Sequence, residues 1–187
     1  MKSNKNLNIP SILDNTPKEC RLDVAFSLLT PLQQEIMRIF LEKKSALSIF
    51  QVRKKLIERW FEELQKEMKK IEPEINHPDN IPVVLFSENH YPGSMVLSKK
   101  SLQECISKYN VRESEHRKEG EKSLMSLKEK ILKEIGVPVP VYSKVEHELN
   151  SMVTIGLLIT IPTGERKTKC LYALDPRVAQ KISMENK

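Results

Sequence analysis

Two short clusters of basic side chains are the residues of this chain best suited to bind a ligand. One lies near the middle of the chain and comprises Arg53, Lys54, Lys55 and Arg59. The other lies in a glycine-containing turn near the C-terminus and comprises Arg166, Lys167 and Lys169. Clustered cations neutralise phosphate groups, so the chemistry that they offer is electrostatic binding.

The sequence contains none of the common arrangements of catalytic residues. It has no phosphate-binding glycine loop, no GxSxG motif and no nucleophile placed beside a base. The 3 cysteines and 4 histidines are scattered, so no two have the spacing of metal ligands, and the cysteines do not form a disulfide framework. We therefore expect no enzyme activity, no metal and no cofactor.

Length and composition limit the class of protein further. The 187 residues are enough for one medium domain or two small ones. Aromatic residues make up only 5%, which argues against an aromatic-rich sandwich, and the 5 glycines argue against a glycine-rich nucleotide-binding fold. The net charge of +6 permits an acidic partner without establishing one. Because no signal peptide or long apolar run is present, we expect a soluble, cytoplasmic protein with no membrane association.

The first half of the chain alternates polar and amphipathic segments. Residues 1–25 are polar, which indicates an N-terminal arm that is mobile or packs late. Thr30 followed by Pro31 is typical of a helix start, and an apolar stripe follows it. A short apolar run at 46–50 then leads into helical patterns that end before Pro73. Two further apolar runs predict a β-hairpin over 83–97.

The last third of the chain has the clearest pattern. Two amphipathic helices are predicted, and each stops at a glycine, Gly136 or Gly156. Strands are predicted at 157–161 and 169–174, with a basic turn between them. Two short helices and a hairpin need a third helix to complete a core, and 101–119 is the nearest candidate. The pattern thus predicts a mainly α fold with small β-hairpins.

This order resembles the winged helix-turn-helix superfamily over Ser126–Leu174, SLKEKILKEIGVPVPVYSKVEHELNSMVTIGLLITIPTGERKTKCLYAL. In that family the helix after the turn enters the DNA major groove, and the hairpin, or wing, touches the DNA backbone or minor groove. The resemblance implies double-stranded DNA as the partner. Pro138 and Pro140 depart from the commonest pattern and delay the start of the second helix.

The resemblance implies two sets of DNA contacts. The basic turn, with Arg166, Lys167 and Lys169, would meet phosphates. The outer face of the second helix offers side chains that can donate to phosphates or base edges: Tyr142, Ser143, Lys144, His147 and Asn150. Glu146 and Glu148 lie on the same helix, where exposed carboxylates would repel phosphates.

A weaker resemblance to the same family covers residues 30–98, with a long first helix, a short strand "ALSI" and a second helix. The expected organisation is therefore tandem: an arm at 1–25, winged-helix domains at 26–110 and 123–187, and a charged connector at 111–122. The basic residues between Arg53 and Arg59 would lie close to DNA, although carboxylates on the same helix could pair with them. Trp60 and Phe61 are either core residues or the anchor of a homodimer.

The favoured interpretation is a dimeric, DNA-binding transcriptional regulator, associated with the nucleoid. The alternative from a different class is a tandem winged-helix module for protein assembly, binding through Trp60 and Phe61 or through Glu146 and Glu148. A replication initiator of a plasmid or virus would show the same pattern, and the sequence does not separate it from a regulator.

Overall fold

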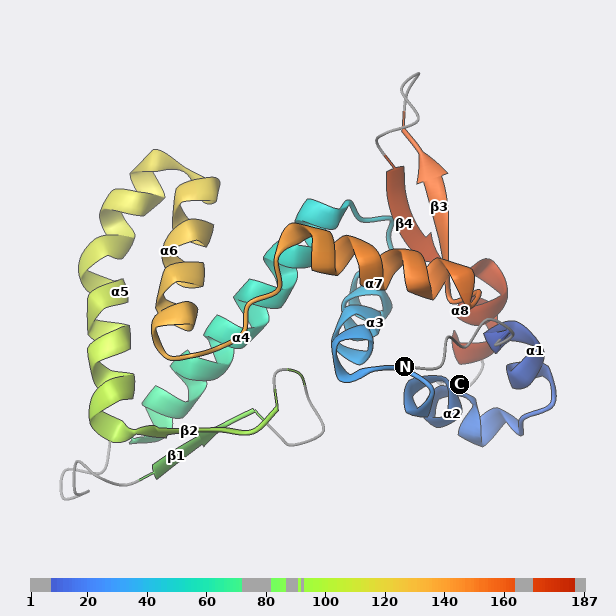
Figure 1. Ribbon diagram of the computed structural model, residues 1–187, viewed down its shortest axis with the longest axis horizontal. Helices are drawn as coiled ribbons and strands as arrows, with labels where there is room; N and C mark the ends of the chain where they lie inside the picture. Colours follow the sequence, from blue (N-terminus) through green and yellow to red (C-terminus); the bar gives the residue numbers. More distant parts are fainter. Residues whose placement is uncertain (1–7, 72–81, 87–90, 92, 164–169, 184–187) are drawn as a thin grey trace. The chain divides into compact units, whose positions relative to one another are not determined.

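The computed structural model describes residues 8–71, 82–86, 91, 93–163 and 170–183. In these residues the protein is mainly helical with two small antiparallel sheets (Figure 1), which confirms the expected mainly α fold with small β-hairpins. The elements in chain order are α1 (Ile9–Asp14), the 3-10 turn η1 (Lys18–Cys20), α2 (Arg21–Ser27), α3 (Pro31–Lys43), α4 (Ile49–Ile71), β1 (Pro82–Leu85), β2 (Met95–Ser98), α5 (Lys99–Glu119), α6 (Glu121–Glu134), α7 (Tyr142–Thr154), β3 (Leu158–Pro162), β4 (Cys170–Leu174) and α8 (Pro176–Ser183).

The chain divides into two compact units that do not follow each other in sequence. Unit 1 comprises Met1–Arg53 and Val141–Lys187, and unit 2 comprises Lys54–Pro140. The expected domains, 26–110 and 123–187, do not coincide with these units. The physical reason is the choice of helix partners: α7 packs against α3, whereas α6 packs against α5. The third helix of the α7 core is therefore α3, in place of the expected segment 101–119.

Helix α3 begins where the sequence predicts. The Thr30 hydroxyl accepts a hydrogen bond from the Gln33 backbone N–H at 3.3 Å, and the Gln33 side-chain carbonyl accepts from the Thr30 N–H at 3.1 Å. These two bonds form a capping box, which satisfies two of the N–H groups left free at a helix start. The apolar stripe that follows is buried, as Ile36 and Phe40 illustrate. It faces α7, whose Val145, Leu149 and Met152 are fully buried.

A two-stranded sheet and an isolated β-bridge complete the core of unit 1. Strands β3 and β4 pair antiparallel, with Leu158 opposite Leu174 and Pro162 opposite Cys170, close to the predicted hairpin. On the other side of β4, Leu47 forms a bridge with Tyr172 through two backbone hydrogen bonds of 2.8 Å. The spatial order is therefore Leu47, β4, β3. The short apolar run at 46–50 contributes this bridge and the start of α4.

The N-terminal segment is part of the folded core of unit 1. The expectation of an arm over 1–25 is wrong for residues 8–25, because α1 and α2 are helices and Ile9 and Leu13 have no exposed surface. The Ile9 N–H donates to the Ile155 carbonyl at 3.1 Å, and α1 packs against α2 and α8. Two of these partners, Ile155 and α8, come from the other end of the chain, so the local pattern gave no sign of the contacts with them.

In unit 2, α5 and α6 lie side by side and run in opposite directions (Figure 1). The turn between them is Gly120, whose φ of 104° is a backbone conformation that favours glycine. The charged segment 111–122, expected as a connector, is the end of α5, this turn and the start of α6. Its charges pair locally: Arg117 pairs with Glu113, and the Ser123 hydroxyl donates to Glu119.

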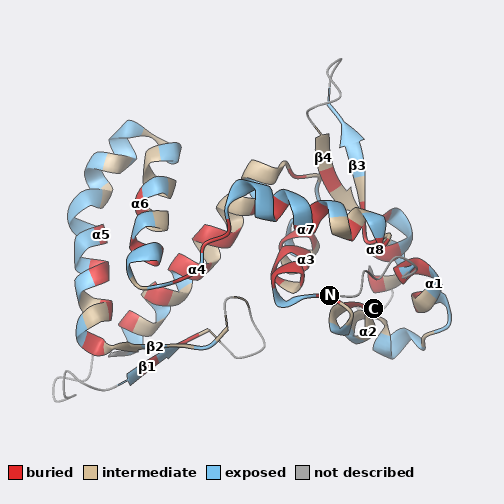
Figure 2. Ribbon diagram, in the orientation of Figure 1, coloured by how far each residue is buried: buried red, intermediate tan, exposed pale blue. Residues whose placement is uncertain are grey.

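Trp60 and Phe61 belong to the core of unit 2, on α4, a helix that is buried over several stretches of its length in Figure 2. Their exposed fractions are 3% and 0%, so neither side chain offers a surface for a partner. The Phe61 ring lies 4.4 Å from the ring of Tyr109, and the Trp60 ring lies 5.6 Å from that of Tyr91. The expectation that one of them anchors a homodimer is therefore not supported by their burial. The exposed apolar residues of this unit include Val111 on α5 and the cross-strand pair Val84 and Val96.

The glycine that ends α7 provides a test of the N-terminal packing. Gly156 has a φ of 81°, and a Cβ added there would lie 3.0 Å from Cδ of Pro10. We expect Gly156→Ala to lower the free energy of unfolding by about 1–2 kcal/mol from the left-handed backbone, with a further loss from contact with Pro10. In a Pro10→Ala background, the loss of unfolding free energy that comes from contact with residue 10 should be smaller. Urea unfolding of the two single variants and the double variant measures this difference, and equal costs in both backgrounds would contradict the packing of α1 on α7.

Candidate functional site

The outer face of α7 carries the residues that the sequence singled out. Tyr142, Ser143, Lys144, His147 and Asn150 are all exposed, and they project from the helix that buries Val145, Leu149 and Met152. Tyr142 is 49% exposed, which places it on the surface and not at the edge of the core. The structure thus brings these five residues together on one helix, as expected.

The start of α7 agrees with the effect expected of the two prolines. The helix begins at Tyr142, directly after Pro138 and Pro140, and its N-cap is Val141. No side chain caps this end, and no acidic residue lies in the first turn. The N–H groups of Lys144 and Val145 donate to the Val141 carbonyl.

Glu148 does not occupy the position that its residue type suggests. The sequence indicated an exposed carboxylate that would repel phosphates, but Glu148 is only 6% exposed. Its Oε2 accepts a hydrogen bond from the side-chain amide of Gln33 on α3 at 3.0 Å. Its Oε1 pairs with Lys144 at 2.7 Å. The spacing along the helix could have predicted this burial. Glu148 lies three residues after Val145 and so falls on the buried stripe of the helix.

Asn150 is connected to the core of unit 1 through Tyr172 on β4. The Tyr172 ring is 1% exposed, and its hydroxyl donates to Oδ1 of Asn150 at 2.9 Å. Sequence reasoning assigned no role to Tyr172. Its central place in a five-residue strand predicts burial, but the partner of its hydroxyl depends on how β4 packs against α7.

Two of the four cations in the basic cluster at 53–59, Lys54 and Lys55, pair with neighbouring carboxylates. Lys54 pairs with Glu121 and, at 3.5 Å, with Glu58, and Lys55 pairs with Glu58 at 2.6 Å. The hydrogen bond to Glu121, partly offset by desolvation, raises the pKa of Lys54 above its usual value. Arg53 falls in unit 1, whereas Lys54, Lys55 and Arg59 fall in unit 2. Pairing with carboxylates, which the sequence allowed, describes this cluster better than an open cationic patch.

The other basic cluster, Arg166, Lys167 and Lys169, lies outside the described residues. The strands that lead to it are described as far as Pro162 on β3 and from Cys170 on β4. Its role in binding therefore stays a prediction.

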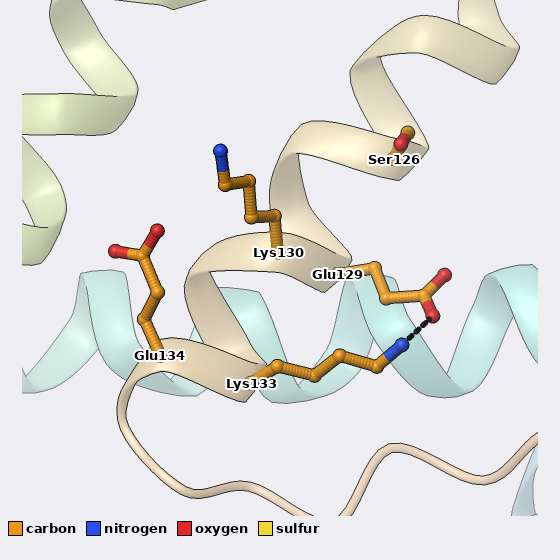
Figure 3. Close-up of a pocket in the computed structure, with 5 residues that line it drawn as sticks. All are labelled: Ser126, Glu129, Lys130, Lys133 and Glu134. Atoms are coloured by element: carbon orange, nitrogen blue, oxygen red, sulfur yellow. Dashed lines mark ion pairs between the residues drawn. The ribbon is translucent and has the colours of Figure 1, made fainter.

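One hollow of the described surface lies along α6. It is lined by Ser126, Glu129, Lys130, Lys133 and Glu134, all from that helix (Figure 3). Its charges are already paired in part, because Lys133 contacts Glu129 at 2.7 Å and Glu134 contacts Lys108 of α5 at 3.2 Å. Within the described residues, no three His, Cys, Asp or Glu side chains gather as metal ligands. No helix in the described part of the chain is long and apolar enough to cross a membrane.

Comparisons with protein-family models, with curated proteins and with solved structures found no match to this chain.

The link between α3 and α7 gives a direct test of the site's framework. Gln33→Ala removes the donor to the buried Glu148 carboxylate and should lower the free energy of unfolding by about 1.5–3 kcal/mol. Lys144→Ala is the matched control, because it removes the exposed partner of the same carboxylate and should cost less than about 1 kcal/mol. Chemical denaturation of both variants compares the two costs. A larger loss for Lys144→Ala would show that the buried bond does not hold the helices together.

Proposed function

We propose that unit 1 is a single winged helix-turn-helix domain that binds duplex DNA, with unit 2 inserted in it. The observation that carries this proposal is the order of elements in unit 1: helix α3, the bridge at Leu47, the start of α4, helix α7, and the hairpin β3–β4. The two segments that resemble the winged-helix family in the sequence each contribute one part of this order. The segment 30–53 provides the first helix, short strand and second helix, and the segment 141–174 provides the third helix and wing.

The spatial arrangement supports the same proposal. Leu47 forms an isolated bridge with β4, and β4 pairs with β3, so the residue expected in the short strand lies beside the hairpin. Helix α7 packs on α3 and on β3 (Figure 1), and the residues of its outer face, such as Ser143, His147 and Asn150, are exposed. In this proposal one split domain takes the place of the tandem arrangement. The support is that residues 1–53 and 141–187, which belong to the two expected copies and the arm, fall in the same compact unit.

In the proposed complex, α7 enters the major groove and the β3–β4 hairpin lies against the sugar-phosphate backbone. Lys144, Ser143 and His147 would donate to phosphates or base edges. The burial of Glu148 favours this role, since it removes one carboxylate from the face that would meet DNA. Glu146 remains exposed and would accept from a cytosine amino group or stay in solvent. Such a protein would act as a regulator of transcription in the cytoplasm, in contact with the nucleoid.

The proposal of a protein-assembly module has less support. It depends on Trp60 and Phe61 or on Glu146 and Glu148 as contact surfaces, and of these four residues only Glu146 is exposed. A replication initiator would use the same DNA-binding geometry and is distinguished by the identity of its target site.

Binding of labelled random-sequence duplexes, followed by fluorescence anisotropy at several salt concentrations, tests the proposal. Affinity should fall steeply as salt rises, because bound cations release counterions from DNA. Arg166→Ala combined with Lys167→Ala should reduce the slope of log affinity against log salt by about one to two units.

Matched variants of single lysines locate the interface on α7. Lys144→Ala should weaken binding, whereas Lys18→Ala, which removes an exposed lysine from η1, should not change it. Circular dichroism confirms that each variant is folded. Absence of binding at low salt, or an affinity independent of salt, would overturn the proposed function.

A further inference from the structure

The hydroxyl of Tyr172 fixes the orientation of the Asn150 side chain. Tyr172 is 1% exposed, and a buried hydroxyl without a partner costs about 1–3 kcal/mol. Its hydrogen has two neighbouring acceptors, the Asn150 carbonyl and the Cys170 sulfur. Because sulfur is a weak acceptor, the hydrogen goes to Oδ1 of Asn150, at an oxygen–oxygen distance of 2.9 Å. The amide oxygen is therefore held toward the core.

This hydrogen bond persists over the whole range of pH in which proteins work. Burial raises the pKa of Tyr172 far above its usual value. The phenol stays protonated, so it remains a donor. Because the Tyr172 hydroxyl remains a donor, the hydrogen bond that holds the Asn150 oxygen toward the core is kept.

The opposite end of the amide faces away from this bond. Asn150 is an exposed residue of α7, on the same outer face as His147 and one turn beyond Glu146. Its Nδ2 group makes no hydrogen bond to any residue in the described part of the chain. A freely rotating asparagine offers one donor and one acceptor together, which is the combination that pairs with adenine N6 and N7. An asparagine whose oxygen is held toward the core presents its N–H donors to the outside.

We propose that Asn150 is a donor-only contact to hydrogen-bond acceptors of duplex DNA, and that Tyr172 is the residue that positions it. This inference rests on the proposed DNA-binding function. The acceptors are guanine O6 and N7, thymine O4 or a phosphate oxygen, which share the same chemistry. A bidentate contact to adenine is disfavoured while the Tyr172 bond is in place.

Selection of binding sites from a pool of random duplexes, carried out in parallel for the wild-type protein and its variants, tests this inference. Asn150→Ala should weaken binding to the wild-type site by about 5- to 150-fold, the equivalent of about 1–3 kcal/mol for a lost base contact. If the loss is confined to one base position, the acceptor is a base; if it is uniform over all sequences, the acceptor is a phosphate. An unchanged affinity would overturn the inference.

Asn150→Asp separates DNA contact from structural support. The aspartate can still accept the Tyr172 hydrogen bond, but it presents an oxygen where the N–H donors were. We expect it to bind DNA at least as weakly as Asn150→Ala, while thermal unfolding stays close to that of the wild type. An affinity equal to that of the wild type would overturn the donor role.

Tyr172→Phe tests the positioning role, because it keeps the ring and removes the hydroxyl. With its oxygen released, Asn150 can rotate, so binding to the wild-type site should weaken and a base contact should gain acceptance of adenine. The matched control is Tyr109→Phe in unit 2, a second buried tyrosine whose hydroxyl bonds to a side chain, that of Glu113. An affinity and base preference of Tyr172→Phe equal to those of the wild type would overturn the positioning role. If the wild-type protein selects no duplex at all, the proposed function itself fails, which is a different result from unaltered variants of a protein that binds.

Discussion

The side-chain amide of Gln33 is the interaction on which the arrangement of unit 1 depends. Its carbonyl closes the capping box at the start of α3, and its NH₂ group reaches α7, where it donates to Glu148 and, at 3.3 Å, to Ser151. A buried carboxylate without a donor is costly, so α7 can dock on α3 only in a register that meets this amide. One side chain thus joins the start of a helix in the first half of the chain to the middle of a helix in the last quarter.

Local patterns predicted most of the elements, because capping residues, glycine stops and apolar periods act within a few residues. The start of α3 at Thr30-Pro31, the end of α7 before Gly156 and the β3–β4 hairpin all follow from such signals. The assembly of these elements could not be predicted in this way. Helix α8, which packs on α1, and helix α3, which packs on α7, each lie about a hundred residues or more away along the chain from their partner. An amphipathic stripe indicates that one face of a helix is buried, but it does not indicate which element covers that face.

The candidate site likewise has features that the local sequence predicted and features that depend on distant elements. The exposed face of α7 was predictable, since it lies opposite a clear apolar stripe. The state of each polar side chain was not, because it depends on atoms from other elements: Glu148 is buried by Gln33, and Asn150 is oriented by Tyr172. The cluster at 53–59 illustrates the converse, since its excess of cations in the sequence is largely offset by carboxylates that the fold brings to it, such as Glu121 from α6.

The pairing of these side chains shows which part of the net charge of +6 is available to attract phosphates. On α7, Lys144 is paired with Glu148, and Glu146 remains exposed, so this helix by itself attracts phosphate only weakly. In the proposed complex the attraction to phosphates must therefore come mainly from the cations of the wing, and α7 contributes side chains of defined orientation. This separation has a physical advantage, because phosphate contacts hold a protein on any duplex, whereas discrimination between bases requires donors and acceptors fixed in direction. An asparagine held by a buried hydroxyl meets that requirement better than a lysine on a flexible stem.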